Sequence, residues 1–368
     1  MKLGSAARQF IIMYVILTTI FTVILLVQNV SLMDSVVIAM SSISIGGFMS
    51  TNDSMASFSM FVKISVIFFM IISATNFYLH YRALFKADIK AYGRNEECRV
   101  MILWFAIIGA MIFFQCLANG EWRHLDGTSG EKFVDILFSV VSVGTTSGMS
   151  TVDYTTHWSS FLDLSLFVVL MFVGGSSGST SGGVKVSRVI ITIKALFNEI
   201  RQQVHPNAVY TVRYNGEGIN HEVVHTAMVI VLAFLLVVGA GAAIFNIDRA
   251  LSFGEAVYLS VAMVTNTGTG AGILFSNYAD MYGWAKLLSC VLMFLGRMEI
   301  LAILVIFTPG FWLEFLGRGG INDLKAKFMV ITRIRKAKRE KESESDDFSG
   351  IPEVGESYQE PPAEEIQD

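Results

Sequence analysis

The chain has 368 residues, of which 53% are hydrophobic and 16% are charged. A soluble protein of this length carries more charge, so the composition excludes an ordinary soluble domain and indicates an integral membrane protein. The formal net charge of -4 comes from an acidic tail and says nothing about the membrane part. The three cysteines, Cys98, Cys116 and Cys290, lack the spacing of a disulfide framework or a zinc site, so we interpret them as apolar side chains in or beside helices.

Six apolar stretches have the length of membrane spans. They are residues 10–28, 61–78, 100–117, 161–204 (interrupted), 223–245 and 284–308. The first is long enough to span the membrane rather than to be a cleaved signal peptide. We therefore expect an all-α membrane protein.

A short pattern occurs three times between these stretches: an acidic residue, an apolar run, and a glycine thirteen positions after the acid. The pairs are Asp34 and Gly47, Asp135 and Gly148, and Glu255 and Gly268. A helical run of about ten residues measures ~15 Å, half of a ~30 Å hydrocarbon core. This predicts a re-entrant pore helix followed by an extended segment.

The extended segments are predicted to form a cation filter. Non-helical backbone at membrane depth is stable only where it is buried or lines a wet cavity, and rings of backbone carbonyls replace the hydration shell of potassium. The expected filter residues are Ile45, Gly46, Gly47 and Phe48; Thr146, Ser147, Gly148 and Met149; and Asn266, Thr267, Gly268 and Thr269. Potassium at this filter is the metal ion that we expect.

Two of the pore helices have start signals. Ser31 and Asp34, and Ser252 and Glu255, have the spacing of a capping box, which satisfies free N–H groups and places negative charge at the positive helix end. A direct attraction of cations to these acids at the outer mouth is compatible with capping.

Lysine and arginine are distributed unevenly. Residues 29–60 contain none, whereas residues 82–99 and 185–213 contain five each. By the positive-inside rule, the filters face outward and both termini lie in the cytoplasm.

The fourth apolar stretch is broken. Residues 161–173 would measure ~20 Å as a helix, too short to span. Ten glycine and hydroxyl residues follow, which cannot form a lipid-facing helix, so we predict a gate loop beneath the third filter. The alternative is close helix packing through small residues. The loop consists of Gly174, Gly175, Ser176, Ser177, Gly178, Ser179, Thr180, Ser181, Gly182 and Gly183.

Arg297 lies thirteen residues into the last stretch, near the expected middle of the membrane. A charge there is costly and faces the bundle interior or a wet cavity. Glu299, two positions on, cannot face it on one helix. We therefore predict that Arg297 belongs to the gate.

Two soluble-enzyme motifs occur by coincidence, and we do not expect an enzyme. Residues 174–178 fit G-x-S-x-G without a preceding strand or a placed acid–histidine pair. Residues 178–185 resemble a phosphate-binding loop, but Val184 interrupts the required Gly-Lys pair.

The C-terminal segment, residues 318–368, is first basic and then acidic. The basic part, residues 325–341, suits anionic lipid headgroups. The acidic part is expected to be a disordered tail.

Five motifs together resemble the Trk/Ktr/HKT superfamily of potassium transporters, most closely the bacterial Trk membrane subunit. They are residues 44–48, 145–148, 174–185, 205–209 and 296–299. The resemblance implies four repeats of helix, pore helix, filter and helix around a pseudo-fourfold pore, with an arginine beside a gate loop in the third repeat. It also implies a homodimer and a cytoplasmic ring of nucleotide-binding regulatory subunits, so this chain would bind no cofactor itself.

Three repeats are evident, at residues 1–99, 100–213 and 214–317. They match the second to fourth repeats of the family, and we expect an upstream segment or a separate polypeptide to supply the first. The leading hypothesis is a pore-forming subunit for potassium uptake across the bacterial cytoplasmic membrane. The alternatives are an ion-coupled carrier of another solute and a non-conducting remnant.

Overall fold

The computed structural model describes residues 3–51, 53–120, 122, 127–152, 161–208, 210–247, 251–270, 278–279 and 281–312. The chain divides into two compact units, Met1–Ile303 and Leu304–Asp368, and the contacts of functional interest lie in the first. The expected basic stretch and acidic tail lie outside the described residues.

The helices form three consecutive sets of three, and we call the middle helix of each set its short helix because it is shorter than the first helix of that set. The sets are α1 (Leu3–Val27), α2 (Leu32–Ser44) and α3 (Met60–Ala74); α6 (Glu96–Ala118), α7 (Ser129–Thr145) and α9 (Phe161–Val173); and α11 (His221–Phe245), α12 (Phe253–Val264) and α13 (Gly283–Arg297). The predicted helical class is confirmed.

Smaller elements connect these sets. They are α4 (Phe77–Lys86), α5 (Lys90–Arg94), α10 (Val186–Val204), α14 (Leu301–Ile306), and a hairpin of β1 (Arg213–Tyr214) and β2 (Glu217–Gly218). The antiparallel hairpin is an element that the sequence did not predict.

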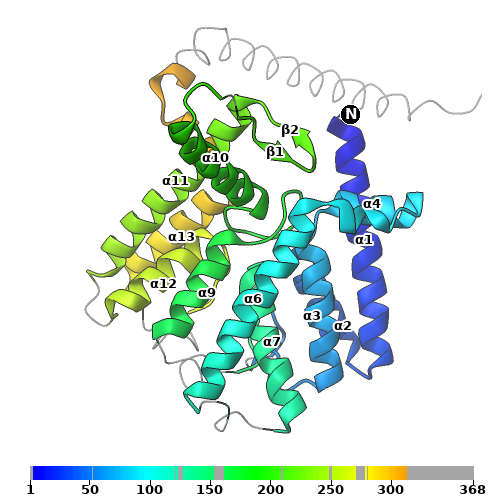
Figure 1. Ribbon diagram of the computed structural model, residues 1–368. Coiled ribbons are helices and arrows are strands. Elements are labelled where there is room, and N and C mark those ends of the chain that lie inside the picture. The colour runs from blue at the N-terminus through cyan, green and yellow to red at the C-terminus, as the bar shows by residue number, and fades with distance from the viewer. Residues whose placement is uncertain are drawn as a thin grey trace, which may run out of the picture. The chain divides into compact units, whose positions relative to one another are not determined.

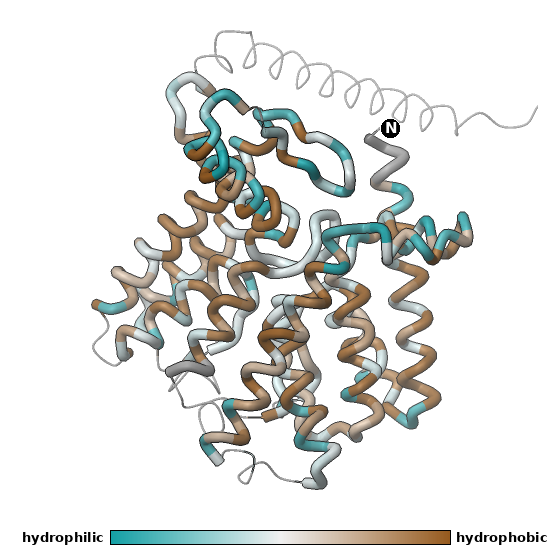
Figure 2. Tube along the Cα trace, viewed as in Figure 1, coloured by the Kyte–Doolittle hydropathy of each residue, from teal (hydrophilic) through white to brown (hydrophobic). Residues whose placement is uncertain are grey.

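Each short helix packs against both other helices of its set, and Figure 1 shows the three sets in blue, cyan to green, and green to yellow. The sets are joined in chain order, because α3 packs against α7 and α9 packs against α12. The outward faces of the first and third helices of the sets expose large apolar side chains, for example Phe61 (74%) and Leu236 (66%). Figure 2 shows that hydrophobic residues predominate along these helices, and exposed apolar side chains of this kind suit contact with lipid.

Among the described residues, three helices are long and apolar enough to cross a membrane, namely α1 over Ala7–Val27, α6 and α11; the bent pair α3 and α4 would be a fourth. The prediction of one continuous stretch at residues 61–78 was wrong. Helix α3 ends at Ala74 because Thr75 is extended, and the Asn76 side chain accepts a hydrogen bond from the Tyr78 N–H, which starts α4 in a new direction. The two helices differ in direction by 100°.

The prediction of a continuous stretch at residues 284–308 was also wrong. Helix α13 ends at Arg297, and Glu299 adopts a left-handed backbone with φ of 55°. A left-handed residue stops an α-helix. Arg297 is therefore the last residue of a helix rather than a residue within a continuous span.

Hydrogen-bonded caps begin the three short helices. At α12 the predicted capping box is present, since Ser252 and Glu255 bond to each other's backbone N–H groups. At α2 the Ser31 side chain accepts from the Asp34 N–H, but the Asp34 carboxylate accepts from the hydroxyls of Ser31 and Ser50 instead of the backbone. That capping box is therefore half formed.

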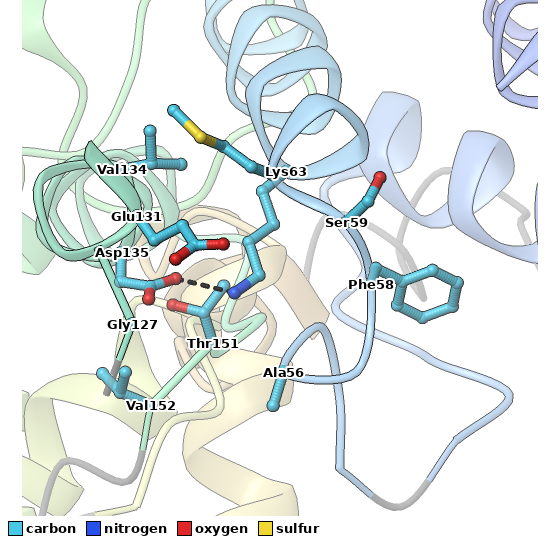
Figure 3. A pocket seen from close by; sticks show the side chains of 11 residues that line it. Ala56, Phe58, Ser59, Lys63, Gly127, Glu131, Val134, Asp135, Thr151 and Val152 are labelled. Carbon is cyan, nitrogen blue, oxygen red and sulfur yellow. Dashed lines mark hydrogen bonds and ion pairs between the residues drawn. The ribbon is translucent and has the colours of Figure 1, made fainter. Parts of the chain in front are cut away.

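In the second set, the acidic residue of the thirteen-residue pattern does not lie at the start of the short helix. Helix α7 starts at a capping box of Thr128 and Glu131 that the sequence analysis missed, so Asp135 lies in the second turn rather than at the helix start. Its carboxylate is 2.9 Å from the Lys63 ammonium of α3, and the two side chains are 9% and 12% exposed. Figure 3 shows this pair at a cavity of about 460 Å³, with Glu131 and Thr151 beside it.

The Lys63–Asp135 pair gives a test of how the first two sets are held together. Lys63→Met leaves a buried carboxylate without its partner, which costs about 3 kcal/mol. We expect a lower thermal unfolding temperature of the purified protein in detergent. The double variant Lys63→Met with Asp135→Leu should recover most of the loss, and the exposed Lys86→Met should change nothing. An unchanged melting temperature for Lys63→Met would show that the pair does not stabilise the contact.

Candidate filter and gate

The three predicted filter segments share one backbone conformation. In each, the glycine and the residue two positions before it are left-handed. The φ angles are 54° at Ile45 and 71° at Gly47, 66° at Thr146 and 77° at Gly148, and 59° at Asn266 and 74° at Gly268. The intervening Gly46, Ser147 and Thr267 have negative φ.

This alternation has a direct effect on the peptide groups. Backbone that alternates between left- and right-handed residues turns successive N–H groups toward one side. A segment of this kind can present a row of carbonyl oxygens. The three segments therefore have left-handed residues at the same two positions.

The first two filter glycines lie against the next segment in the chain. A Cβ atom at Gly47 would be 2.3 Å from the Ser147 carbonyl oxygen, and one at Gly148 would be 2.0 Å from the Thr267 carbonyl oxygen. No side chain fits at either position. A Cβ atom at Gly268 would meet none of the described atoms within 4 Å. The three segments are thus neighbours in chain order.

Hydroxyl groups of α7 and α12 form hydrogen bonds with the second and third segments. Ser142 donates to the Met149 carbonyl oxygen at 2.6 Å, and Tyr258 shares a hydrogen bond of 3.0 Å with Thr269. The fourth residues of the segments differ, since Phe48 is 79% exposed whereas Met149 and Thr269 are buried.

The similar stretches that follow the first two filters also lie together. The Met55 N–H donates to the Ser150 carbonyl oxygen at 2.9 Å, and the Ser150 N–H donates to the Ser54 hydroxyl at 3.1 Å. The stretch that follows the first glycine segment therefore contacts the stretch that follows the second.

The predicted gate loop, residues 174–183, contacts the C-terminal ends of all three short helices. The Thr180 hydroxyl donates to the Ile43 carbonyl oxygen of α2 at 2.8 Å. The Ser181 hydroxyl donates to the Thr145 carbonyl oxygen of α7, also at 2.8 Å. Beside α12, a Cβ atom at Gly182 would be 1.9 Å from the Thr265 carbonyl oxygen. The loop therefore lies where the three filters begin.

The gate loop is more fully hydrogen-bonded than the sequence indicated. The Ser176 N–H donates to the Ala74 carbonyl oxygen at 2.8 Å, and the Gly178 carbonyl oxygen accepts from Phe77 at 3.1 Å. Val186, the first residue of α10, donates to the Gly175 carbonyl oxygen at 3.0 Å. These single bonds join the loop to its neighbours although residues 174–183 form no helix or strand. Its small residues also allow close packing, as the alternative interpretation proposed.

Two cationic side chains bind successive carbonyl groups of this loop. Arg297 Nη1 donates to the Thr180 carbonyl oxygen at 3.1 Å, and Lys185 Nζ donates to that of Ser181. The Glu299 carboxylate accepts a hydrogen bond from Arg188 of α10 at 2.7 Å. The structure thus brings Arg297 and the loop together.

Sequence reasoning missed two residues at this site. Lys185 was part of a recognised motif, and its position directly after the glycine stretch was the available signal. Glu97 is 2% exposed and accepts from the Ser177 N–H of the loop at 2.6 Å. It comes just before the apolar stretch at residues 100–117. A carboxylate at the end of such a stretch is ordinarily interpreted as exposed to solvent.

Comparison with known proteins identifies the family. Residues 5–312 match the family model TrkH, described as cation transport protein. The Trk system potassium uptake protein TrkH of Salmonella typhimurium is 29% identical over 327 residues, which cover 85% of this chain and 64% of that protein. TrkI of Halomonas elongata is 31% identical over 317 residues, covering 84% and 62%.

A solved structure is also similar to this chain. The crystal structure of the potassium transporter TrkH from Vibrio parahaemolyticus matches with a TM-score of 0.76 and 29% identity, covering 84% of this chain and 65% of that one. The chain therefore spans just under two thirds of the length of these relatives. The family match, however, extends over most of the present sequence, and the chain belongs to the TrkH family of cation transport proteins.

Proposed function

We propose that the chain is the pore-forming subunit of a potassium uptake system in the bacterial cytoplasmic membrane. The observation that carries this proposal is the contact of three glycine segments of one backbone conformation, each following a short helix. Relatives that match most of this chain are named Trk system potassium uptake proteins.

The proposed ion path uses backbone groups rather than charged side chains. The segments 45–48, 146–149 and 266–269 would coordinate dehydrated potassium through their carbonyl oxygens. The C-terminal ends of α2, α7 and α12 precede these segments, and the negative ends of helix dipoles favour a cation there.

The gate loop and Arg297 form the proposed gate. The loop contacts the end of each short helix, so it would obstruct the path beneath the filters. Arg297 and Lys185 hold the loop by two successive carbonyl groups and place positive charge beside the path. Opening requires these contacts to break.

The apolar helices and the family membership make the chain an integral membrane protein. We place the basic ends of α4, α10 and the hairpin in the cytoplasm, since Figure 2 shows hydrophilic residues concentrated there. The filters would then face outward and both termini would be cytoplasmic.

The proposed assembly is a homodimer that binds a cytoplasmic ring of nucleotide-binding regulatory subunits. The relatives are named as parts of a Trk system, which supports partner subunits. Nucleotides would bind those partners, and this chain would carry no cofactor beyond the transported potassium ion.

Rubidium uptake tests the proposed function. The protein, expressed from its complete natural gene, should restore growth at low potassium and rubidium uptake to cells that lack potassium uptake systems. Failure of both, with the protein present in the membrane, would contradict the proposal.

Gly148→Ala tests the filter. The added methyl group meets the Thr267 carbonyl oxygen and strains a left-handed residue, so we expect at least about a tenfold loss of potassium-over-sodium selectivity or of rubidium flux, the effect of ~1.4 kcal/mol. Gly239→Ala is the matched control, because it lies in α11 with no neighbour within 4 Å of its Cβ position. Equal permeability ratios in the two variants at equal expression would remove Gly148 from the filter.

Arg297→Ala tests the gate. Loss of a charged hydrogen bond to the loop, worth roughly 1.5–3 kcal/mol, should raise the open population and basal rubidium flux by about tenfold and weaken the dependence on a cytoplasmic partner. Lys286→Ala on the same helix is the control, since Lys286 bonds to Ala279 and not to the loop. If Arg297→Ala has wild-type flux and normal expression, the arginine is structural.

A further inference from the structure

Glu97 is a buried carboxylate at the first turn of α6, and the filter and gate described above do not use it. Its side chain is 2% exposed. Burying a carboxylate is costly unless donors satisfy its oxygens. The identity of those donors therefore indicates what the residue holds in place.

One oxygen of Glu97 joins the gate loop to α10. Its Oε1 accepts from the Ser177 N–H at 2.6 Å and from the Ser187 N–H at 3.2 Å. Ser187 lies in the first turn of α10, where the helix dipole favours negative charge. The Ser187 hydroxyl also donates to the Ser177 hydroxyl at 3.0 Å, so the loop and the start of α10 are joined twice.

The other oxygen joins the same carboxylate to the β1–β2 hairpin. Glu97 Oε2 accepts from the Tyr214 hydroxyl at 3.1 Å. Burial raises the pKa of Tyr214, and so does the adjacent Glu97 carboxylate, so the phenol keeps the proton that it donates. The hairpin is fixed to the start of α6 by a second pair of bonds, because the Glu96 N–H donates to Asn215 Oδ1 at 2.7 Å and the Asn215 N–H donates to Glu96 at 3.2 Å.

A purely structural role would need fewer of these contacts. Capping of α10 requires the Ser187 N–H alone, yet the shortest bond of Glu97 goes to the loop and its second oxygen goes to the hairpin. The hairpin itself exposes Arg213 and residues 216–218. One buried carboxylate thus links a surface hairpin to the loop beneath the filters.

We propose that Glu97 is a positioning residue that couples the β1–β2 hairpin to the gate loop, so that a movement of the hairpin changes the packing of the loop. This coupling rests on the proposed function only in that the loop is taken to be the gate. A movement of the hairpin, which lies at the hydrophilic end of the protein, would then release the loop from its packed position.

The experiment measures loop packing without measuring transport. Ser177 lines a cavity of about 420 Å³ between α10 and α11, where a thiol reagent can reach it. In the complete protein, Ser177→Cys is placed in a Cys290→Ser background, since Cys98 and Cys116 are buried. The labelling rate is then compared for Glu97→Gln, for Tyr214→Phe, and for the exposed Glu199→Gln on α10 as the matched control. Rubidium flux is measured for the same variants.

We expect Glu97→Gln to raise the labelling rate by about tenfold, the effect of losing one hydrogen bond to a charged group. Tyr214→Phe, which keeps the ring and removes the hairpin link alone, should raise it in the same direction. Glu199→Gln should match the parent. Unchanged labelling in Tyr214→Phe would overturn the coupling, and this variant decides the matter if Glu97→Gln fails to fold.

The flux data separate this inference from the proposed function. Increased labelling without rubidium flux in any variant, the parent included, would leave the coupling intact and refute potassium transport. Rubidium flux in the parent with unchanged labelling in Glu97→Gln and Tyr214→Phe would refute the coupling and leave transport intact. In the Arg297→Ala background, where the loop is already released, Glu97→Gln should raise flux no further.

Discussion

The rest of the structure depends on two places where backbone meets backbone, Gly47 against Ser147 and Gly148 against Thr267. Irregular backbone at membrane depth must be surrounded by protein or line a wet cavity. The three glycine segments meet that condition for one another by close contact, which leaves no room for a side chain. In each segment, left-handed residues occupy the same two positions.

Each short helix is fixed so that its segment starts at the same place. Caps at Ser31, Thr128 and Ser252 define the helix starts. The packing of α3 on α7 and of α9 on α12 brings neighbouring sets together, and the Lys63–Asp135 pair adds a charged contact between the first two. These contacts set the positions of the three glycine segments, and the loop of residues 174–183 binds at the helix ends that precede them.

The gate loop is held from two directions. Arg297 and Lys185 bind its carbonyl groups beside the filters, whereas Glu97 binds the Ser177 N–H at the start of the loop. Two cations therefore bind carbonyl oxygens of this short segment, and one anion binds an N–H group of the same segment. Because the loop is rich in glycine, its conformation depends on these contacts together with the hydroxyl bonds of Thr180 and Ser181.

Local patterns predicted the features that are set locally. The short helix at residues 161–173 and the capping box at Ser252 could be inferred from spacing and composition alone. The role of the three glycine segments as a filter remains a prediction. The contact of Arg297 with the loop followed from the cost of an intramembrane charge. The repeat boundaries at residues 99, 213 and 317 remain a prediction.

Features that depend on contacts between distant segments were missed. Asp135 matched the spacing of a helix start, but its partner Lys63 is 72 residues away in the sequence. Glu97 acquires its role from Ser177 and Tyr214, which no sequence spacing links to it. The break after Arg297 was hidden because the residues around it are apolar enough to continue a helix.

The most direct test of the central claim is to locate the ion. Crystals of the complete protein grown with rubidium in place of potassium would be measured by anomalous scattering. The account predicts a rubidium peak enclosed by the backbone carbonyls of the segments at Gly47, Gly148 and Gly268, on the side of the filters away from Arg297. Ordered protein density at these glycines without any rubidium peak between them would contradict it.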